Sequence, residues 1–466
     1  MKIKRTKKGA KISLTASDVD SAVMQFVCSC HPEFARGYSL NALDAQAVMV
    51  DAIMAQPRKG AVNDIGVPGQ QGFGVGVCPG PLPEGMTGLD GFNDVTSENY
   101  ANYIFSDGSI MVWIPAYFYK IGNGKNGFPI NKPDVKSFAY FSDVAAAKSA
   151  GYALHRAFYD GGKIQPGAFV DKFMCSNNNG VASSLKNGSP LSTWSSHNPI
   201  NALNGKPGNS YYGTIAAAKT RGVSFFVNSR FIHAALALLS LAHADASTDK
   251  TYCGWYDPKH NFPKGCNNGS LSDNFDRGLR YEGDGYGSCG KTGSANFLNR
   301  TTHNGQSDVA DLNGLMYEVN PGVTSDGKQL LVMNIAASMK DITAGATLST
   351  DHWGPKGRKN NYETMPGSDD LVAKGYQRFG VDLNLLSGDT EGTGWNLTGA
   401  GIALPSSIKN PLLNGGYWNY PTKDLVPISS CRWGVYGAAG VWFVNLNSPR
   451  AGSGYAVGFR CACYLE

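Results

Sequence analysis

The chain has 466 residues, of which 42% are hydrophobic and 17% are charged, and its formal net charge is +5. This small charge excludes an extended basic nucleic-acid-binding surface, because the basic residues cluster only between positions 2 and 11, which we interpret as a solvated terminus. The 58 glycines, together with the sparse charge, favour short strands and long loops over a helical bundle.

No secretory signal is expected, because no apolar segment follows the basic start before Ser17. The longest apolar run, Phe231 to Ala244, contains two histidines and is too short to cross a bilayer. We therefore expect a protein that is made in a cytosol and does not insert into membranes.

The cysteines and histidines show no metal-binding spacing. None of the ten cysteines forms a CxxC pair, and the eight histidines form no HxxxH or HExxH motif. Cys253, Cys266 and Cys289 share one loop-rich region and could pair, but without a secretory context we favour reduced thiols. We expect no metal and no cofactor, and we interpret His233 and His243 as core residues of an apolar helix.

The first part of the chain is predicted to form a small N-terminal region. Apolar residues at helical spacing over 41–56, followed by Pro57, predict a helix. Residues 60–100 are rich in glycine and proline and are interpreted as a linker. The spacing of Gly72, Gly74 and Gly76 does not match a dinucleotide-binding loop, and the prolines that follow prevent a helix there.

The remaining elements predict an α+β fold with short strands, two main helices and long loop insertions. Segments 247–310 and 345–400 are expected to be loops, and residues 412–463 are expected to form short strands separated by glycine. The other predicted strands are 109–121 with a bulge or edge at Pro115, 167–174, 310–319 and 329–334, and the predicted helices are 142–150, 214–221 and 229–244.

The C-terminal tail, residues 431–463, combines a stiff hydrophobic frame with small, exchangeable residues. Tyr436, Phe443 and Tyr455 stand beside glycine or alanine in turn-like sequence, where we expect their rings at the surface. Tyrosine mixed with serine and glycine is typical of binding faces, because tyrosine offers contact area at low entropic cost. A fixed frame under variable side chains would let such a face change without unfolding the protein.

Several segments, taken in order, resemble the C-type lectin fold of the formylglycine-generating-enzyme-like group. They are Met111–Pro115, Phe169–Phe173, the helix at 229–244, Asp311–Glu318 and the closing Gly458-Phe459-Arg460. Leu315 and Met316 depart from the pattern of that group, whose corresponding element is Gly-Asn-Val-Trp-Glu-Trp. The resemblance covers roughly residues 100–466.

Within that group, the tail is most similar to the variable proteins of diversity-generating retroelements, which include phage tail receptor-binding proteins of the major tropism determinant type. The resemblance implies an attachment or oligomerisation region over 1–95 and a ligand-binding domain over 96–466, with a variable region at about 430–460. It implies a scaffold of Trp433, Trp442, Gly458, Phe459 and Arg460. It also implies the diversified, ligand-facing residues Val435, Tyr436, Ala438, Phe443, Ser448, Gly452, Gly454, Tyr455 and Ala456.

In this family a reverse transcriptase mutates template adenines, mainly at Asn codons, and the resulting NNC codons cannot encode Met, Gln, Lys or Glu. The sequence from Cys431 to Tyr464 contains none of these four, and Asn445 and Asn447 could be unmutated template asparagines. The resemblance further implies a location in the virion, synthesis in the bacterial cytoplasm, and a homotrimer. The implied partners are a host cell-surface protein or glycan receptor and other tail proteins, with no nucleic acid.

Two alternatives are a copper-dependent oxidase of the formylglycine-generating type and a carbohydrate-binding module of fixed specificity. The oxidase uses two converging cysteine thiolates, and Cys431 matches the first position. The second position falls near Gly437 or Ala438, where the sequence has no thiol. No calcium-binding pattern supports the carbohydrate module, and we expect a binding protein and not an enzyme.

Overall fold

The computed structural model separates the chain into two compact units, Met1–Lys59 and Gly60–Glu466. In the first, β1 (Lys2–Thr6) and β2 (Gly9–Ser13) pair as an antiparallel hairpin, so Lys2, Lys4, Arg5 and Lys11 lie on strands. The helix predicted at 41–56 lies outside the described residues. The structure describes residues 2–6, 9–13, 60–122, 125–129, 132–203, 208–209, 211–256, 268–273, 276–341, 361–364, 377–378, 417–418, 423–435, 440–441 and 443–465.

The segment expected to be a linker belongs to the second unit, which begins at Gly60 and not near residue 96. Ile65 and Phe73 are buried in its core. Gly74 has φ +97°, and a Cβ there would lie 2.1 Å from the side-chain nitrogen of Asn304. The glycines of this segment therefore serve close backbone packing, which the interpretation as a linker missed.

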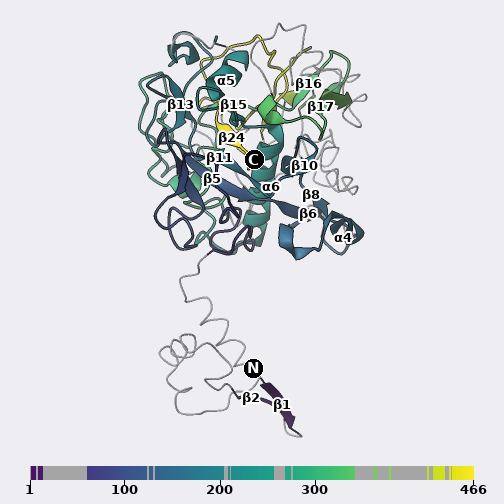
Figure 1. Ribbon diagram of the computed structural model, residues 1–466. Coiled ribbons are helices and arrows are strands. Elements are labelled where there is room, and N and C mark those ends of the chain that lie inside the picture. Colours follow the sequence, from purple (N-terminus) through teal and green to yellow (C-terminus); the bar gives the residue numbers. More distant parts are fainter. Residues whose placement is uncertain are drawn as a thin grey trace. The chain divides into compact units, whose positions relative to one another are not determined.

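The main sheet of the second unit has six strands in the order β14-β24-β11-β5-β4-β3, and all neighbours are antiparallel. The C-terminal strand β24 lies between β11 and β14, so the end of the chain is built into the sheet (Figure 1). Every residue of β11 is buried, because both faces of this strand are covered. The strands are β3 (Met86–Gly88), β4 (Asn102–Phe105), β5 (Ile110–Pro115), β11 (Gly167–Asp171), β14 (Phe226–Val227) and β24 (Cys461–Cys463).

A second six-stranded sheet, which we call the tail sheet, takes two short strands, β22 and β23, from the C-terminal tail and has the order β19-β20-β22-β21-β15-β23. Its β15–β23 and β20–β22 pairs are parallel, and its other pairs are antiparallel. The strand predicted over 310–319 is shorter than expected. The strands are β15 (Tyr317–Val319), β19 (Gln377–Arg378), β20 (Tyr417–Trp418), β21 (Ile428–Ser429), β22 (Val444–Asn445) and β23 (Val457–Gly458).

The strand predicted over 109–121 is two strands in different sheets. The chain leaves β5 at Pro115 and enters β6 (Tyr117–Ile121), which pairs with β7 and β8. Between them, the Ala116 amide donates to the Pro166 carbonyl at 2.8 Å. The remaining strands form small sheets: β7 (Pro133–Ser137) and β8 (Ala153–Leu154); β9 (Tyr159–Asp160) and β10 (Lys163–Ile164); β12 (Cys175–Asn178) and β13 (Val181–Ser184); and β16 (Val323–Ser325), β17 (Leu330–Met333) and β18 (Tyr362–Thr364).

Three α-helices match the predicted helical segments: α4 (Val144–Ser149), α5 (Tyr211–Ala218) and α6 (Arg230–Ala246). The Ser229 hydroxyl caps α6 by accepting from the Ile232 amide at 3.1 Å. Helix α6 is buried from Arg230 to Ala244, as its apolar surface predicts. Within the described ranges, no helix is long and apolar enough to span a membrane. Short 3-10 turns occur at Phe138–Tyr140, Arg156–Phe158, Ile200–Ala202, Leu298–Arg300 and Met339–Asp341.

The fold is therefore of the mixed α+β kind, with several small, mainly antiparallel sheets and few helices. His233 and His243 of α6 are buried and bonded to backbone, which confirms them as core histidines. The Nε2 of His233 lies 2.9 Å from the Val441 carbonyl, and the Nδ1 of His243 accepts from the Gly69 amide at 3.1 Å.

Candidate functional site

The C-terminal tail rests on a buried frame. Trp433 is 6% exposed, and Phe459 and Arg460 are fully buried. At Gly458 a Cβ would lie 2.6 Å from the Leu191 carbonyl oxygen, so only glycine fits. These residues have the burial expected of a scaffold, whereas Trp442 lies outside the described residues.

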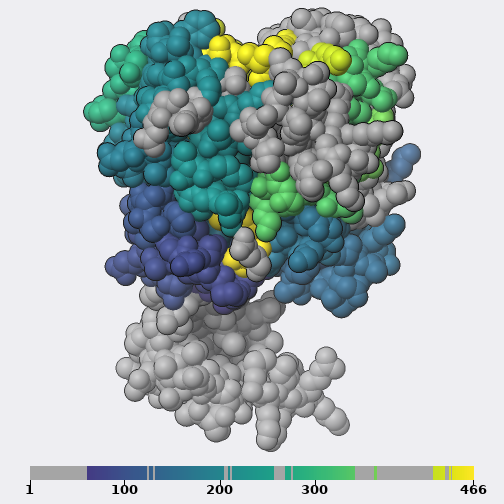
Figure 2. Space-filling view, turned by 45° about the horizontal axis from the view of Figure 1, so that its top comes forward, coloured from purple at the N-terminus to yellow at the C-terminus, as the bar shows by residue number. Residues whose placement is uncertain are grey.

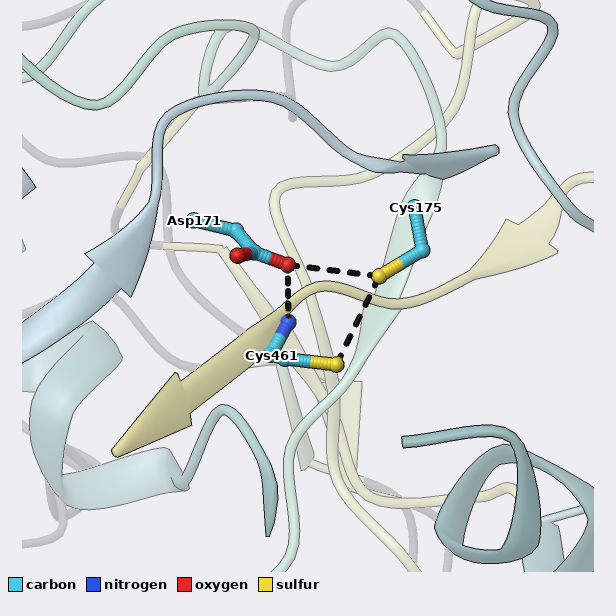
Figure 3. Close-up of side chains that lie close together, drawn as sticks. All are labelled: Asp171, Cys175 and Cys461. Atoms are coloured by element: carbon cyan, nitrogen blue, oxygen red, sulfur yellow. Dashed lines mark hydrogen bonds between the residues drawn. The ribbon is translucent and has the colours of Figure 1, made fainter. Parts of the chain in front are cut away.

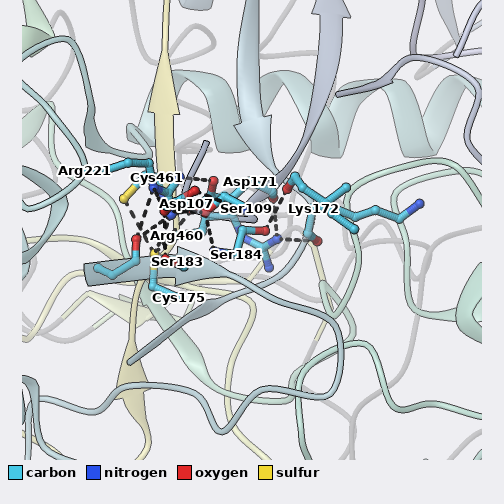
Figure 4. A network of polar contacts seen from close by, with 12 residues as sticks. Asp107, Ser109, Asp171, Lys172, Cys175, Ser183, Ser184, Arg221, Arg460 and Cys461 are labelled. Carbon is cyan, nitrogen blue, oxygen red and sulfur yellow. Dashed lines mark hydrogen bonds and ion pairs between the residues drawn. The ribbon is translucent and has the colours of Figure 1, made fainter. Parts of the chain in front are cut away.

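Arg460 connects the main sheet to the tail sheet. Its Nε and Nη2 each donate to a different oxygen of Glu318 on β15 at 2.6 Å, and both side chains are fully buried. Its Nη1 donates to the carbonyls of Asp171 and Lys172 at 3.1 Å, close to the end of β11 (Figure 4). A bidentate ion pair with further carbonyl acceptors fixes both the position and the angle of the arginine. The connection between β23 and β24 is therefore stiff.

Tyr455 is the exposed aromatic residue in the described part of the tail. Its side chain is 44% exposed, and its ring centroid lies 5.7 Å from that of the buried Trp433. The Arg432 guanidinium lies 5.3 Å from the Tyr455 ring centroid and donates to the tyrosine hydroxyl. The two side chains are thus held on a rigid base while remaining accessible to a ligand.

A hollow of about 110 Å³ lies in the same part of the tail. The loop at Ser192–Thr193 supports the backbone here, because the Thr193 amide donates to the Val457 carbonyl at 2.8 Å and the Gly454 amide donates to the Thr193 hydroxyl at 2.9 Å. We call the surface formed by Arg432, Ser448 and Gly452–Tyr455 the tail face. Residues Ser448, Gly452 and Ser453 line the hollow, together with Thr193, Val319, Val426, Ile428, Pro449 and Val457.

Two of the nine predicted ligand-facing residues are buried, and the prediction is wrong for them. Phe443 is 0% exposed and packs against Cys431 and Tyr317, because it directly precedes β22 and points into the tail sheet. Ala456 is 2% exposed and packs in the same cluster as Trp433.

The other predicted positions are divided among the exposed surface, the half-buried surface and the part of the chain that is not described. Tyr455 is exposed, and Val435, Ser448, Gly452 and Gly454 are half-buried. The predicted residues Tyr436 and Ala438 lie outside the described residues. The sequence reasoning missed Arg432 and Thr193. Arg432 contacts Tyr455, and Thr193 contacts Gly454 and Val457. Contacts between residues so far apart in the chain are not visible in the local sequence.

A buried cluster of Asp171, Cys175 and Cys461 lies behind the frame (Figure 3). The Cys175 thiol donates to Asp171 at 3.3 Å, and the two sulfurs are 3.6 Å apart. The Arg221 guanidinium balances the Asp171 carboxylate through contacts of 2.5 and 3.1 Å. Because an arginine already supplies the positive charge, this cluster is a structural network and a poor site for a metal cation.

Cys431, the candidate first thiol of an oxidase site, is buried and donates to the Tyr317 hydroxyl at 3.5 Å. Burial raises the pKa of the Cys431 thiol to about 11. Among the described residues, Cys431 belongs to neither group of three side chains that could hold a metal ion. The described cysteines are all free: Cys78, Cys175, Cys253, Cys289, Cys431, Cys461 and Cys463.

The carboxylates that the sequence places near one another are each used in packing. Asp308 lies 3.4 Å from the Nε2 of His303. Asp311 accepts from the Thr292 hydroxyl and the Gly293 amide, both at 2.7 Å. With Glu318 held by Arg460, the three groups do not converge on a common point, in line with a structural role.

The C-terminal residues reach the surface along the upper edge of the space-filling view, next to residues from the middle of the chain (Figure 2). A larger cavity, of about 680 Å³, lies elsewhere and is lined by Gly80, Lys163, Ser338 and Tyr464 among others. None of the predicted variable residues lines it. The large cavity and the tail face are therefore separate features.

Comparison with known proteins gives a distant likeness to solved structures. No family model matches the chain, and no curated protein matches it. A solved structure named Major Tropism Determinant U1 Variant is similar at 9% sequence identity with a TM-score of 0.29. The match covers 77% of this chain and 65% of that chain, so the chain spans less than two thirds of the length of that protein.

Proposed function

We propose that the chain is a receptor-binding protein of a phage tail, whose C-type lectin-like domain presents a ligand-binding face diversified by a retroelement. The observation that carries this proposal is the tail face. There the exposed Tyr455 packs against the buried Trp433 and beside the half-buried Arg432, next to a hollow that Ser448, Gly452 and Ser453 help to line. Tyrosine and arginine are enriched among residues that dominate binding energy, and small neighbours can be exchanged with little effect on the fold.

The rigid frame supports tight binding by a small face. Arg460, Glu318 and Gly458 hold the tail backbone, so little ordering is required when a ligand binds. Several copies on one virion would raise the effective concentration and strengthen a modest single contact. We further propose that the target is a host cell-surface protein or glycan, that the N-terminal part attaches the protein to other tail proteins, and that the protein is a homotrimer.

Binding of the labelled full chain to a panel of bacterial strains tests this function. We expect Tyr455→Ala to lower affinity for a recognised strain at least ~10-fold, the scale of a hot-spot loss. Tyr140→Ala is the matched control, because Tyr140 is 64% exposed and lies outside the tail face. If Tyr455→Ala binds like the wild type, or if both variants lose binding equally, the tail face is not the receptor site.

The flanking DNA tests the diversification. We expect a near-identical copy of the segment encoding residues 430–460, with adenines at the variable codons, beside a reverse transcriptase gene. A genome with neither the copy nor the reverse transcriptase gene would contradict diversification and leave the binding role to the test above.

We propose that the protein binds without catalysis, and a copper titration distinguishes this from the oxidase alternative. An oxidase would bind one copper ion tightly and convert a cysteine-containing peptide, and Cys431→Ser would abolish both. We expect Cys431→Ser to leave any copper binding unchanged and the wild-type chain to show no turnover, because the buried Cys431 has a hydroxyl as its polar neighbour.

A further inference from the structure

Three side chains that the tail face does not use meet close to it: His197, Asp284 and Cys289. Each offers one metal-ligating atom, and these atoms lie within 4.8 Å of one another. The side chain of His197 is 8% exposed and that of Asp284 is 0% exposed. Cys289 is fully buried.

Two tight loops bring these groups together. A bridge between Gly283 and Gly290 closes the first loop, and the Asp284 amide donates to the Cys289 carbonyl at 2.9 Å. The carboxylate and the thiol therefore leave the same loop side by side. His197 comes from the second loop, which is closed by the bridge between Ser192 and Pro199.

Two of the three ligand atoms are buried without a hydrogen-bond partner in the described part of the chain. They are the Nε2 of His197 and the Oδ2 of Asp284. The two atoms are 3.6 Å apart, which is too long for a hydrogen bond. A buried polar group left unpaired is costly, so an imidazole nitrogen and a carboxylate oxygen that face each other in this way indicate a missing ligand between them.

We propose that His197, Asp284 and Cys289 bind a zinc ion. Nitrogen, oxygen and thiolate sulfur together suit zinc, whereas calcium and magnesium prefer oxygen ligands alone. Zinc–ligand bonds of about 2.0–2.3 Å in a tetrahedron separate ligand atoms by roughly 3.3–3.7 Å. The 3.6 Å His197–Asp284 separation already fits, and the widest pair, at up to 4.8 Å, must close by roughly 1 Å.

Binding exchanges one proton for the metal and changes no oxidation state. Zn²⁺ takes the neutral Nε2 of His197, the Asp284 carboxylate and the Cys289 sulfur, and the thiol proton goes to the solvent. A water molecule occupies the fourth position. The oxygen of Asp284 that would not bind zinc already accepts from the Tyr286 amide at 2.8 Å, which orients the carboxylate.

The proposed ion lies beside the frame of the tail. The His197 ring stacks on Trp433 at 5.5 Å between centroids, and Trp433 supports Tyr455. Zinc would therefore fix the loop around His197 under the tail face. This inference does not depend on the proposed receptor, since the ion would be structural whatever the tail face binds.

The cluster of Asp171, Cys175 and Cys461 provides the comparison. It also has sulfur and oxygen atoms, but Arg221 occupies the position that a cation would need. In the described part of the chain, no arginine or lysine makes a hydrogen bond or ion pair with His197, Asp284 or Cys289. The His197 cluster therefore lacks the positive charge that Arg221 supplies to the Asp171 cluster.

The test is zinc binding by the purified full chain after removal of metal with a chelator. We expect calorimetry to show tight zinc binding that Cys289→Ser weakens by more than the roughly 10–100-fold that loss of an outer contact costs. His197→Gln and Asp284→Asn are expected to weaken the same binding. Cys175→Ser is the matched control, because it removes a buried thiol from the other cluster, and it should bind zinc as the wild type does.

X-ray absorption of the zinc-loaded wild-type chain gives a second measurement that needs no variant. We expect one sulfur ligand and otherwise nitrogen and oxygen ligands. Two or more sulfur ligands, absence of zinc binding, or wild-type affinity in folded Cys289→Ser would each overturn the proposed site.

Discussion

Two aromatic residues of the tail, Phe443 and Tyr455, have opposite environments although both were expected at the surface. Phe443 stands between Trp442 and Val444, whereas Tyr455 stands between Gly454 and Ala456. Phe443 is fully buried, while Tyr455 is 44% exposed. The difference comes from pairing in the tail sheet, where Phe443 precedes β22, whereas Tyr455 lies in the turn before β23. Local sequence carries no signal for such long-range pairing.

Alanine substitutions at these two residues should therefore differ in their effect on stability. We expect Phe443→Ala to lower the free energy of unfolding by about 3–5 kcal/mol, because it leaves a cavity in the tail sheet. Tyr455→Ala should cost about 1 kcal/mol or less, as is usual at the surface. Urea unfolding of both variants measures this, and equal losses would mean that Tyr455 is also part of the core.

Removing one partner of the Arg460–Glu318 pair should be among the most damaging single changes. Glu318→Gln leaves a buried guanidinium without its counter-charge, and we expect a loss of about 3–5 kcal/mol. Glu363→Gln is the control, since Glu363 on β18 is only partly buried. A loss in Glu318→Gln no larger than in the control would show that the pair does not stiffen the tail.

At the scale of elements, predictions succeed where local pattern decides the structure. Helix α6 is found from its apolar run and the Ser229 cap, and β11 from its alternating residues. The prediction for 109–121 joins two strands, because the bond between Ala116 and Pro166 that divides them is not visible in the local pattern. The linker at 60–95 was wrong for the same reason, since its glycines pack against residues such as Asn304 that are distant in sequence.

Strand β23 depends on the close approach of its Gly458 to the Leu191 carbonyl. We expect Gly458→Ala to destabilise the protein by about 1–3 kcal/mol, because the methyl group would displace backbone. At Gly434 the nearest atom to an added Cβ is the flexible end of Arg432 at 3.6 Å, so Gly434→Ala should be nearly neutral. Thermal unfolding of the two variants compares them, and the opposite order would contradict this packing.

At the scale of the whole molecule, buried histidines make folding sensitive to acid. Burial lowers the pKa of His155 to about 3 and also lowers the pKa values of His233, His243 and His303. The unfolded chain takes up these protons below about pH 6.5 while the folded chain does not, so stability falls as the pH falls. Burial raises the pKa of Asp311 to about 6 and also raises the pKa values of Asp160, Asp171, Asp245 and Glu363, and these carboxyls act in the opposite sense.

We therefore expect the free energy of unfolding to fall between pH 7.5 and pH 5.5. Each histidine that stays neutral costs about 1.4 kcal/mol at pH 5.5. Urea midpoints across this range measure the slope, and His155→Asn, which retains an acceptor for the Ala157 amide, should reduce it. A stability that is constant or rises toward pH 5.5 would show that these histidines are not held neutral.

The most direct test of the central claim is a display experiment in which codons 448 and 455 and codons 443 and 459 are randomised separately. Folded display and binding to bacterial strains are then scored together. We predict that most substitutions at Ser448 and Tyr455 preserve folding and change which strains are bound, whereas few at Phe443 and Phe459 fold. Equal intolerance at all four positions, or unchanged strain preference at Ser448 and Tyr455, would contradict a stiff frame that carries an exchangeable binding face.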